Sequence, residues 1–389
     1  VQHLVEDAEI ELVVTDGAAH RGETLRGLRG GIDTLRVGGA YEKALSKAGA
    51  PQPRYNDESA VLYTSGTTAV AKGVRLTQAN QTLGTFLGPA SLLGLTPGDT
   101  VLIATPLGHR VGQVRLLGGL LTGARTVLRS DARPGTLVEA IERFRVTVTG
   151  MVPTIARDLA LSGLDVGARL ASLRVLSVTG EAMTAELRRR VAEMLPGTEL
   201  WTFFASTETG LAAALPPAAF TARPTSSGRA LPGVELSVMD PAGLAAAMGS
   251  GELLVRSGTP GSYAVGAGYI GAAAQSPFVD GDGWFHTGDI ARLDADGWLA
   301  ITGRSKDMIL SGGFNIAAQE VEDVLRQHPG VRDVAVTGEP DERFGERVVA
   351  WVVADGAGGS TATAQDLREF TATRVAAFKR PRIVRCVEA

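Results

Sequence analysis

Short runs of β-branched residues alternate with amphipathic stretches along most of this chain. Strand-like runs include residues 100–104, 174–178 and 331–336. Between such runs apolar residues recur at helical spacing, and one predicted helical face holds Met183, Leu187, Val191 and Leu195. Alternation of this kind predicts an α/β architecture.

Composition argues against several classes of protein. The 389 residues are 44% hydrophobic and 21% charged, which is ordinary for a globular protein of two or three domains. The formal net charge is −4 and no long basic tract occurs, so we expect no nucleic acid partner. No apolar run approaches the ~20 residues of a membrane span, and the first residues lack a signal-peptide pattern. The single cysteine, Cys386, allows no intrachain disulfide and fits the cytoplasm.

Turn-forming glycines at residues 295–305 predict a domain boundary. We therefore expect a large domain, residues 1–305, and a small domain, residues 306–389. About 85 residues suffice for a small α+β domain. The elements expected there are a helix at about 317–327, strands at 331–337 and 347–353, and a helix after the Gly-rich loop 355–360. Thr363 and Asp366 have the spacing of a capping box for that last helix.

The most informative segment, residues 63–74, reads Tyr-Thr-Ser-Gly-Thr-Thr-Ala-Val-Ala-Lys-Gly-Val and follows an apolar run that predicts a strand. Hydroxyl side chains and glycines let backbone N–H groups approach phosphate oxygens, and Lys72 adds a mobile positive charge. A polar surface turn is the alternative. The segment is not a Walker loop, which has Gly before the lysine and Ser or Thr after it, where this chain has Ala71 and Gly73.

This segment resembles the phosphate loop of the adenylate-forming superfamily, which contains acyl-CoA synthetases, adenylation domains and luciferases. The chain departs from the family pattern at Ala69 and Ala71, where the family has Gly and Pro. Further segments resemble family motifs in the family's order: residues 106–109, 177–182, 201–208, 228–233, 251–253, 284–289, 303–307, 312–316 and 320–322. The resemblance covers nearly the whole chain. It implies a large layered α/β domain, incomplete at its N-terminus, and a small, mobile α+β C-terminal domain.

The resemblance also implies a reaction. A carboxylate attacks the α-phosphate of ATP, pyrophosphate leaves, and the acyl-adenylate then passes its acyl group to coenzyme A. Because both reactants are anionic, catalysis rests mainly on charge neutralisation and positioning. The residues implied to hold the β- and γ-phosphates are Thr64, Ser65, Gly66, Thr67, Thr68 and Lys72. Glu208 would bind Mg²⁺, which accepts one protein carboxylate plus phosphate oxygens, and Thr207 would touch the α-phosphate. For Glu208 the alternative is an exposed carboxylate at a helix start.

The same resemblance implies an adenosine site. Phe204 would stack on the adenine, opposite a wall formed by Gly180, Glu181 and Ala182. Asp289 would accept hydrogen bonds from the ribose hydroxyls, and Arg304 would approach the same sugar. The alternatives are a core role for Phe204 and a turn role for Asp289.

Lys306 occupies the family's hinge position, where rotation of the small domain exchanges an adenylating face for a thiol-admitting face. Gly312 and Gly313 would then approach the thiol. A plain exposed lysine is the alternative for Lys306. The family's catalytic lysine would lie beyond Ala389, and about a hundred family residues would precede Val1. We expect both segments in the natural protein.

The acyl substrate is only partly constrained. Residues 106–112 contain no acidic side chain, which argues against an amino acid substrate. His109 resembles an acyl gate, with a structural histidine as the alternative. Arg110 and Arg115 could pair with a second carboxylate or polar group of the substrate, or at least one could face solvent. Ala205 stands where many relatives have Gly and would shorten the pocket, which favours a small or aromatic acid.

The leading interpretation is therefore an AMP-forming acid–CoA ligase. One alternative is a stand-alone adenylating enzyme that uses another acceptor, such as the thiol of an acyl carrier protein. Another is a non-catalytic nucleotide-binding relative, which the departures at Ala69 and Ala71 would suit. The sequence indicates no oligomeric state.

Overall fold

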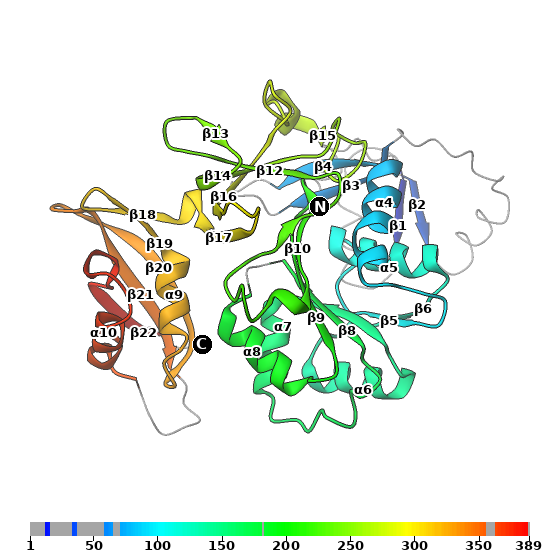
Figure 1. Cartoon of the computed structure of the whole chain (residues 1–389), viewed down its shortest axis with the longest axis horizontal. Coiled ribbons are helices and arrows are strands. Elements are labelled where there is room, and N and C mark those ends of the chain that lie inside the picture. Colours follow the sequence, from blue (N-terminus) through cyan, green and yellow to red (C-terminus); the bar gives the residue numbers. More distant parts are fainter. Residues whose placement is uncertain are drawn as a thin grey trace.

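A seven-stranded, mostly parallel sheet is the centre of the large domain (Figure 1). The computed structural model describes residues 12–15, 33–36, 58–64, 71–180, 183–354 and 362–387. The strand order is β11-β10-β9-β8-β7-β5-β6. The parallel strands are β5 (Thr100–Ile103), β6 (Arg125–Leu128), β7 (Val148–Met151), β8 (Val175–Thr179) and β9 (Glu199–Ser206). The antiparallel edge consists of β10 (Gly210–Leu215) and β11 (Arg229–Ala230).

The helices start at residues that suit helix ends. They are α5 (Arg110–Thr122), α6 (Pro134–Phe144), α7 (Pro153–Leu161) and α8 (Ala185–Met194). Helices α6 and α7 have proline in the first turn, where a missing N–H costs nothing. The Thr184 side chain caps α8. The predicted apolar face is buried, although Met183 and Leu195 flank α8 instead of lying within it.

Successive side chains of the parallel strands enter two different cores. Leu102 and Leu176 pack with α6, α7 and α8, whereas Val101 and Val175 pack on the other face. Burial on both faces is what a parallel sheet requires, and it explains the strand-like runs in the sequence.

Antiparallel sheets complete the large domain. One is three-stranded and contains β3 (Glu58–Thr64), β4 (Lys72–Thr77) and β15 (Gly268–Tyr269). Another contains β12 (Glu235–Met239), β13 (Ala245–Ala246), β14 (Gly249–Arg256), β16 (Phe285–Leu293) and β17 (Leu299–Arg304). The remaining elements are the parallel pair β1 (Leu12–Thr15) and β2 (Asp33–Arg36), helix α4 (Gln78–Thr85), and the short turns η1 (Phe86–Ala90), η2 (Pro217–Ala219) and η3 (Gly271–Gln275).

The C-terminal elements form a separate unit with its own core. Its strands are β18 (Met308–Ser311), β19 (Phe314–Ala317), β20 (Val331–Asp341), β21 (Gly345–Ala354) and β22 (Ile383–Val387). Its helices are α9 (Ala318–Leu325), α10 (Ala364–Ala372) and the turn η5 (Ala377–Lys379). Buried Val321, Leu325 and Leu367 belong to a core cluster made only of residues after 308. In Figure 1 this unit lies to one side of the rest, with α9 on the side nearer β17.

The predicted fold class is confirmed, and most predicted C-terminal elements are present. The Thr363–Asp366 capping box is formed in full. Strand β20 is longer than predicted, because it pairs with β21 as far as Asp341 opposite Gly345. The Gly-rich loop 355–360 lies outside the described residues. The turn η4 (Ser305–Asp307) connects β17 to β18, so the proposed division at residues 305 and 306 falls between two different sheets.

Candidate active site

The two ends of the predicted phosphate loop lie side by side. Strand β3 ends at Thr64 and β4 begins at Lys72, and these two residues are partners in the antiparallel ladder. The Thr64 hydroxyl oxygen is buried and has no hydrogen-bond partner among the described residues. Ser65, Gly66, Thr67 and Thr68 fall in 65–70, outside the described residues. A buried hydroxyl without a partner at this position suits a phosphate oxygen as its missing partner.

Tyr269 connects Lys72 to Glu208. It lies in β15, which pairs with β4. The Lys72 ammonium nitrogen is 5.3 Å from the centre of the Tyr269 ring, and the Tyr269 hydroxyl donates to Glu208 Oε1 at 3.3 Å. Burial, with the Glu208 charge beside it, raises the pKa of Tyr269, so the phenol remains a donor. Tyr269 stands outside every sequence motif, and only the β15–β4 register brings it to this site.

Arg110 lies beneath the turn that carries Thr207 and Glu208. Its guanidinium donates to the carbonyl oxygens of Thr207 at 2.7 Å and Ala264 at 2.9 Å. Only 6% of the residue is exposed. Burial lowers the pKa of Arg110 to about 10, and the nearby Glu208 charge opposes this shift. The side chain is therefore still charged at neutral pH and holds the turn in place.

A glycine makes this close approach of Arg110 possible. Gly210 has a φ of +64°, and a Cβ there would lie 2.7 Å from the Ala264 oxygen and 2.9 Å from the Arg110 guanidinium. For Arg110 the solvent-facing alternative is wrong. Its guanidinium is engaged by backbone carbonyls, and Arg110 is not among the residues that line the cavity described below.

Asp289 and Arg304 are ladder partners on β16 and β17. Arg304 Nε donates to Asp289 Oδ1 at 3.1 Å, and Asp289 is only 8% exposed. Burial raises the pKa of Asp289, while Arg304 opposes the shift. Among the described residues, Oδ2 of Asp289 has no hydrogen-bond partner, which leaves an acceptor that a diol could use.

Gly180 and Phe204 lie at the same edge of the parallel sheet. Strands β8 and β9 pair Thr179 with Phe203, so the next residue of each strand is Gly180 and Phe204. Gly180 has a φ of +110°, a conformation that favours glycine. Phe204 is half-buried and packs against the core. Glu181 and Ala182 lie outside the described residues. The carboxyl edge of such a sheet is where ligands bind in doubly wound α/β folds.

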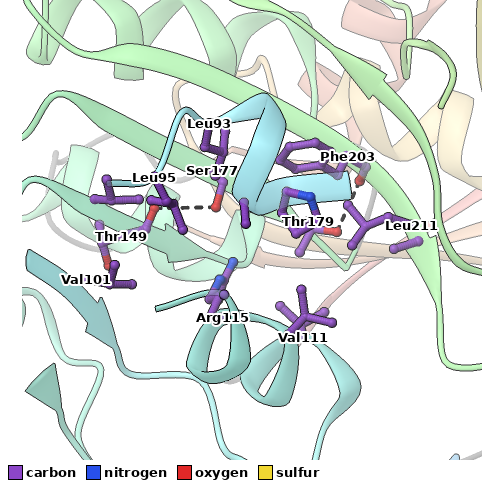
Figure 2. A pocket seen from close by; sticks show the side chains of 16 residues that line it. Leu93, Leu95, Val101, Val111, Arg115, Thr149, Ser177, Thr179, Phe203 and Leu211 are labelled. Carbon is purple, nitrogen blue, oxygen red and sulfur yellow. Dashed lines mark hydrogen bonds between the residues drawn. The ribbon is translucent and has the colours of Figure 1, made fainter. Parts of the chain in front are cut away.

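An open cavity, about 560 Å³ with the adjoining solvent space included, lies between part of α5 and the sheet (Figure 2). Its lining is mostly apolar and includes Leu93, Val101, Val111, Val114 and Ala205. The hydroxyls of Thr149, Ser177 and Thr179 also line it, and each donates to a backbone carbonyl. Ala205 therefore lies where a substrate-lining residue would. His109 is the exposed N-cap residue of α5, makes no capping bond, and is not among the lining residues.

Arg115 is the one charged residue among those that line this cavity. Its Nη1 donates to the Thr105 hydroxyl. Burial lowers the pKa of Arg115 to about 10, so it too is charged at neutral pH. The solvent-facing alternative is wrong here as well, because the side chain of Arg115 extends from α5 into the cavity (Figure 2).

The proposed hinge and thiol residues lie on exposed backbone. Lys306 is in η4, with its ammonium nitrogen 4.0 Å from Asp307. Gly312 and Gly313, between β18 and β19, have φ values of +60° and +82°, which explains the paired glycines. Lys379 forms an ion pair with Glu320 at 2.6 Å, so it has a structural partner of its own.

Comparison with known proteins decides the family. The model of the AMP-binding enzyme family matches residues 1–269, and the model of the AMP-binding enzyme C-terminal domain matches residues 320–389. The chain belongs to the AMP-binding enzymes. It is 37% identical over 361 residues to a methyl-dioxo-octahydro-indenyl-propanoyl:CoA ligase of Mycobacterium tuberculosis, a match that covers 90% of this chain and 66% of that protein.

Two solved AMP-binding enzymes have the same fold. ATP-bound MatB from Rhodopseudomonas palustris superposes with a TM-score of 0.88 at 27% identity, over 100% of this chain and 77% of that one. The o-succinylbenzoate coenzyme A synthetase MenE of Bacillus subtilis, in complex with ATP and magnesium, gives 0.84 at 26% identity, over 100% and 78%. The chain spans 58 to 66% of the length of several curated relatives. Among the described helices, none has the length and apolarity needed to span a membrane.

Proposed function

We propose that this chain is the greater part of an AMP-forming acid–thiol ligase, which activates a carboxylic acid as its acyl-adenylate and transfers the acyl group to coenzyme A. The observation that carries the proposal is the convergence of Thr64, Lys72, Tyr269 and Glu208 beside an apolar cavity lined by Ala205. Phosphate-binding groups and an apolar cavity for the acyl chain are the two halves that such a reaction needs. Relatives named CoA ligases support coenzyme A as the acceptor.

The residues at the phosphate end fit ATP with Mg²⁺. Glu208 uses Oε1 to accept from Tyr269, and among the described residues its Oε2 has no partner. One carboxylate oxygen plus phosphate oxygens is a donor set that Mg²⁺ accepts. The ion would supply charge neutralisation where pyrophosphate leaves. Bound ATP and magnesium in a relative of the same fold support this assignment.

The chain's own residues then position two anions for reaction. Lys72 and the Thr64 hydroxyl, with Ser65 to Thr68, hold the β- and γ-phosphates, and Thr207 contacts the α-phosphate. Arg110 keeps Thr207 and Glu208 in place through the Thr207 carbonyl. Both the carboxylate nucleophile and the phosphate are negative, so fixed positive charge at this point lowers the barrier more than general acid–base catalysis would.

Asp289, Arg304, Phe204 and Gly180 supply the adenosine site of the proposal. Asp289 accepts hydrogen bonds from the ribose hydroxyls, and its ion pair with Arg304 opposes the burial that raises the pKa of this carboxyl. Phe204 and Gly180 lie at the sheet edge on either side of the adenine. The proposal also assigns Glu181 and Ala182 to adenine binding.

In the second half-reaction, the small domain (residues 306–389) rotates about Lys306 and brings Gly312 and Gly313 to the incoming thiol. His109, at the exposed start of α5, is the proposed gate of the acyl cavity, although it does not line the cavity in this structure. The single cysteine, Cys386, supports a cytoplasmic location, where thiols stay reduced.

Acid-dependent exchange of labelled pyrophosphate into ATP tests the proposal. The natural protein that contains this chain is incubated with ATP, Mg²⁺ and single carboxylic acids. We expect exchange with at least one acid in the absence of coenzyme A, and thioester when coenzyme A is added. Exchange without thioester formation would move the proposal to a carrier-protein or other acceptor. Exchange with no acid from a broad panel would contradict adenylation itself.

A further inference from the structure

The cavity beside α5 contains a charged group that the fold itself does not neutralise. Figure 2 shows Arg115 reaching from α5 among apolar side chains such as Leu95 and Val101. Among the described residues, its one hydrogen-bond partner is the neutral Thr105 hydroxyl, and it has no ion-pair partner. A guanidinium has five N–H donors, so most of its hydrogen-bonding capacity is unused.

Other arginines at buried or partly buried positions have more partners than Arg115 does. Arg110 donates to two backbone carbonyls, and Arg188 donates to three, those of Met183, Pro224 and Ser226. Arg174 pairs with Asp99. Against these, Arg115 is the exception. Arg115 is partly buried, and a charge held among apolar side chains without a counterion is costly. An unneutralised guanidinium in an apolar cavity therefore points to a partner that arrives with the ligand.

The sheet makes room for this side chain. Gly150 lies in β7, and a Cβ built there would lie 2.0 to 2.2 Å from atoms of the Arg115 guanidinium. A glycine inside a buried strand loses packing, and it is found where another group must come close. The absence of a side chain at Gly150 therefore leaves space for the guanidinium in the cavity wall.

The position of Arg115 also sets its distance from the carboxyl edge of the sheet. Gly150 pairs with Ser177 on β8, three residues before Gly180 at the carboxyl edge. Three residues of strand correspond to about 10 Å. The proposed adenylation centre lies at that edge, so the guanidinium would face the far end of a bound acid and leave an apolar stretch between the two.

We propose that Arg115 is a specificity-determining residue that binds a second carboxylate of the acyl substrate. The substrate class is then a dicarboxylic acid whose two carboxylates are separated by an apolar spacer of several carbons or a ring. This inference rests on the proposed ligase function. A carboxylate satisfies both the charge and the paired N–H donors of the guanidinium, whereas a neutral oxygen satisfies only the donors.

The test compares acids that differ only at the far end. Each α,ω-dicarboxylic acid in a series of spacer lengths is assayed beside its ω-methyl ester and the keto acid of equal length, and kcat/KM for AMP release is measured. For the wild type we expect the best diacid to exceed its ester and keto analogue about ten- to hundred-fold, the size of a charged hydrogen-bond effect. In Arg115→Met this preference should disappear, while turnover of the ester stays within a few-fold of wild type.

Control variants separate charge from folding. Arg332→Met removes an exposed arginine on β20 and should leave the preference intact. Arg115→Lys keeps the charge and should retain part of it. Gly150→Ala should displace the guanidinium and lower diacid turnover selectively. Circular dichroism checks that each variant is folded.

Equilibrium binding of the diacid, measured by calorimetry without ATP, distinguishes a failure of the ligase function from a failure of the Arg115 role. Arg115-dependent diacid binding without AMP release would overturn the ligase function and keep only the carboxylate-binding role of Arg115. Two results would overturn this inference and keep the function. One is AMP release with a preference for the ester or keto acid, and the other is an equal loss of activity on all substrates in Arg115→Met. Neither binding nor AMP release would overturn both.

Discussion

The Tyr269 hydroxyl donates a hydrogen bond to Glu208 Oε1 over 3.3 Å, and so joins β15 to the turn after β9. The same ring lies under the Lys72 ammonium group, 5.3 Å from its centre. One tyrosine therefore contacts both the proposed phosphate-binding lysine and the proposed Mg²⁺ ligand. This arrangement fixes which Glu208 oxygen remains for the metal ion.

Tyr269→Phe should keep the ring and lose the hydrogen bond to Glu208. A hydrogen bond to a charged group contributes ~1.5–3 kcal/mol, so we expect adenylation to slow roughly ten-fold or more, with a higher Mg²⁺ requirement. Pyrophosphate exchange at varied Mg²⁺ measures both effects. Tyr263→Phe, which removes another half-buried phenol, is the control and should be near wild type. Equal effects of the two substitutions would show that Tyr269 does not act through Glu208.

Glu208→Gln should lower the adenylation rate while leaving ATP affinity nearly unchanged. The amide keeps the shape and the Tyr269 contact but loses the charge that a cation needs. We expect a fall of at least a hundred-fold in kcat for pyrophosphate exchange. A nucleotide-binding titration supplies the comparison, and an unchanged kcat would show that Glu208 does not bind the metal.

Asp289→Asn should weaken ATP binding and stabilise the fold. Because burial raises the pKa of Asp289, the folded protein holds that proton more tightly than the unfolded chain does. The resulting stability is present at pH values below the unfolded pKa and is lost as pH rises through the folded pKa. A neutral amide should therefore raise Tm at pH 7 by up to about 2 °C, and the gain should vanish in acid. A lower Tm at pH 7 would show that the Arg304 ion pair outweighs burial.

Lys306→Pro should separate the two half-reactions. Proline fixes φ near −65°, so a hinge at this residue could no longer change its backbone angle. We expect pyrophosphate exchange to survive if the locked angle suits adenylation, and thioester yield to fall more than ten-fold. Lys306→Ala removes the same side chain without fixing φ and should retain most of the thioester yield. Normal thioester formation by the proline variant would place the pivot elsewhere.

Motif spacing predicted more of the fold than local propensity alone could. The buried face predicted from Met183 to Leu195 and the Thr363 cap follow from local sequence. The cap is present, and all four apolar residues are buried, with Leu187 and Val191 inside α8 and Met183 and Leu195 flanking it. Strand β20 continues past Gly338 and Pro340, residues that usually end a strand, because β21 pairs with it along its length. Long-range pairing of this kind leaves no signal within one segment.

The candidate site likewise contains residues that the sequence predicts and residues that only the folded chain brings together. Asp289 and Arg304 were predicted together, and the β16–β17 register makes them partners. Tyr269 reaches Glu208 across 61 positions and belongs to no motif, so only the folded chain reveals it. Arg110 and Arg115 were indistinguishable in sequence. Five residues of α-helix turn through about 500°, so the two side chains leave α5 in directions about 140° apart. Arg110 therefore meets backbone carbonyls while Arg115 enters the cavity.

The central claim is that the α-phosphate of ATP is the reacting centre. The direct measurement is product analysis with ATP labelled at the α-phosphate, in the natural protein that contains this chain, with acid and coenzyme A varied independently. The account predicts that all label appears as AMP in the presence of both acid and coenzyme A, with one acyl thioester formed for each AMP. Label recovered as ADP, with phosphate as the other product, would contradict it.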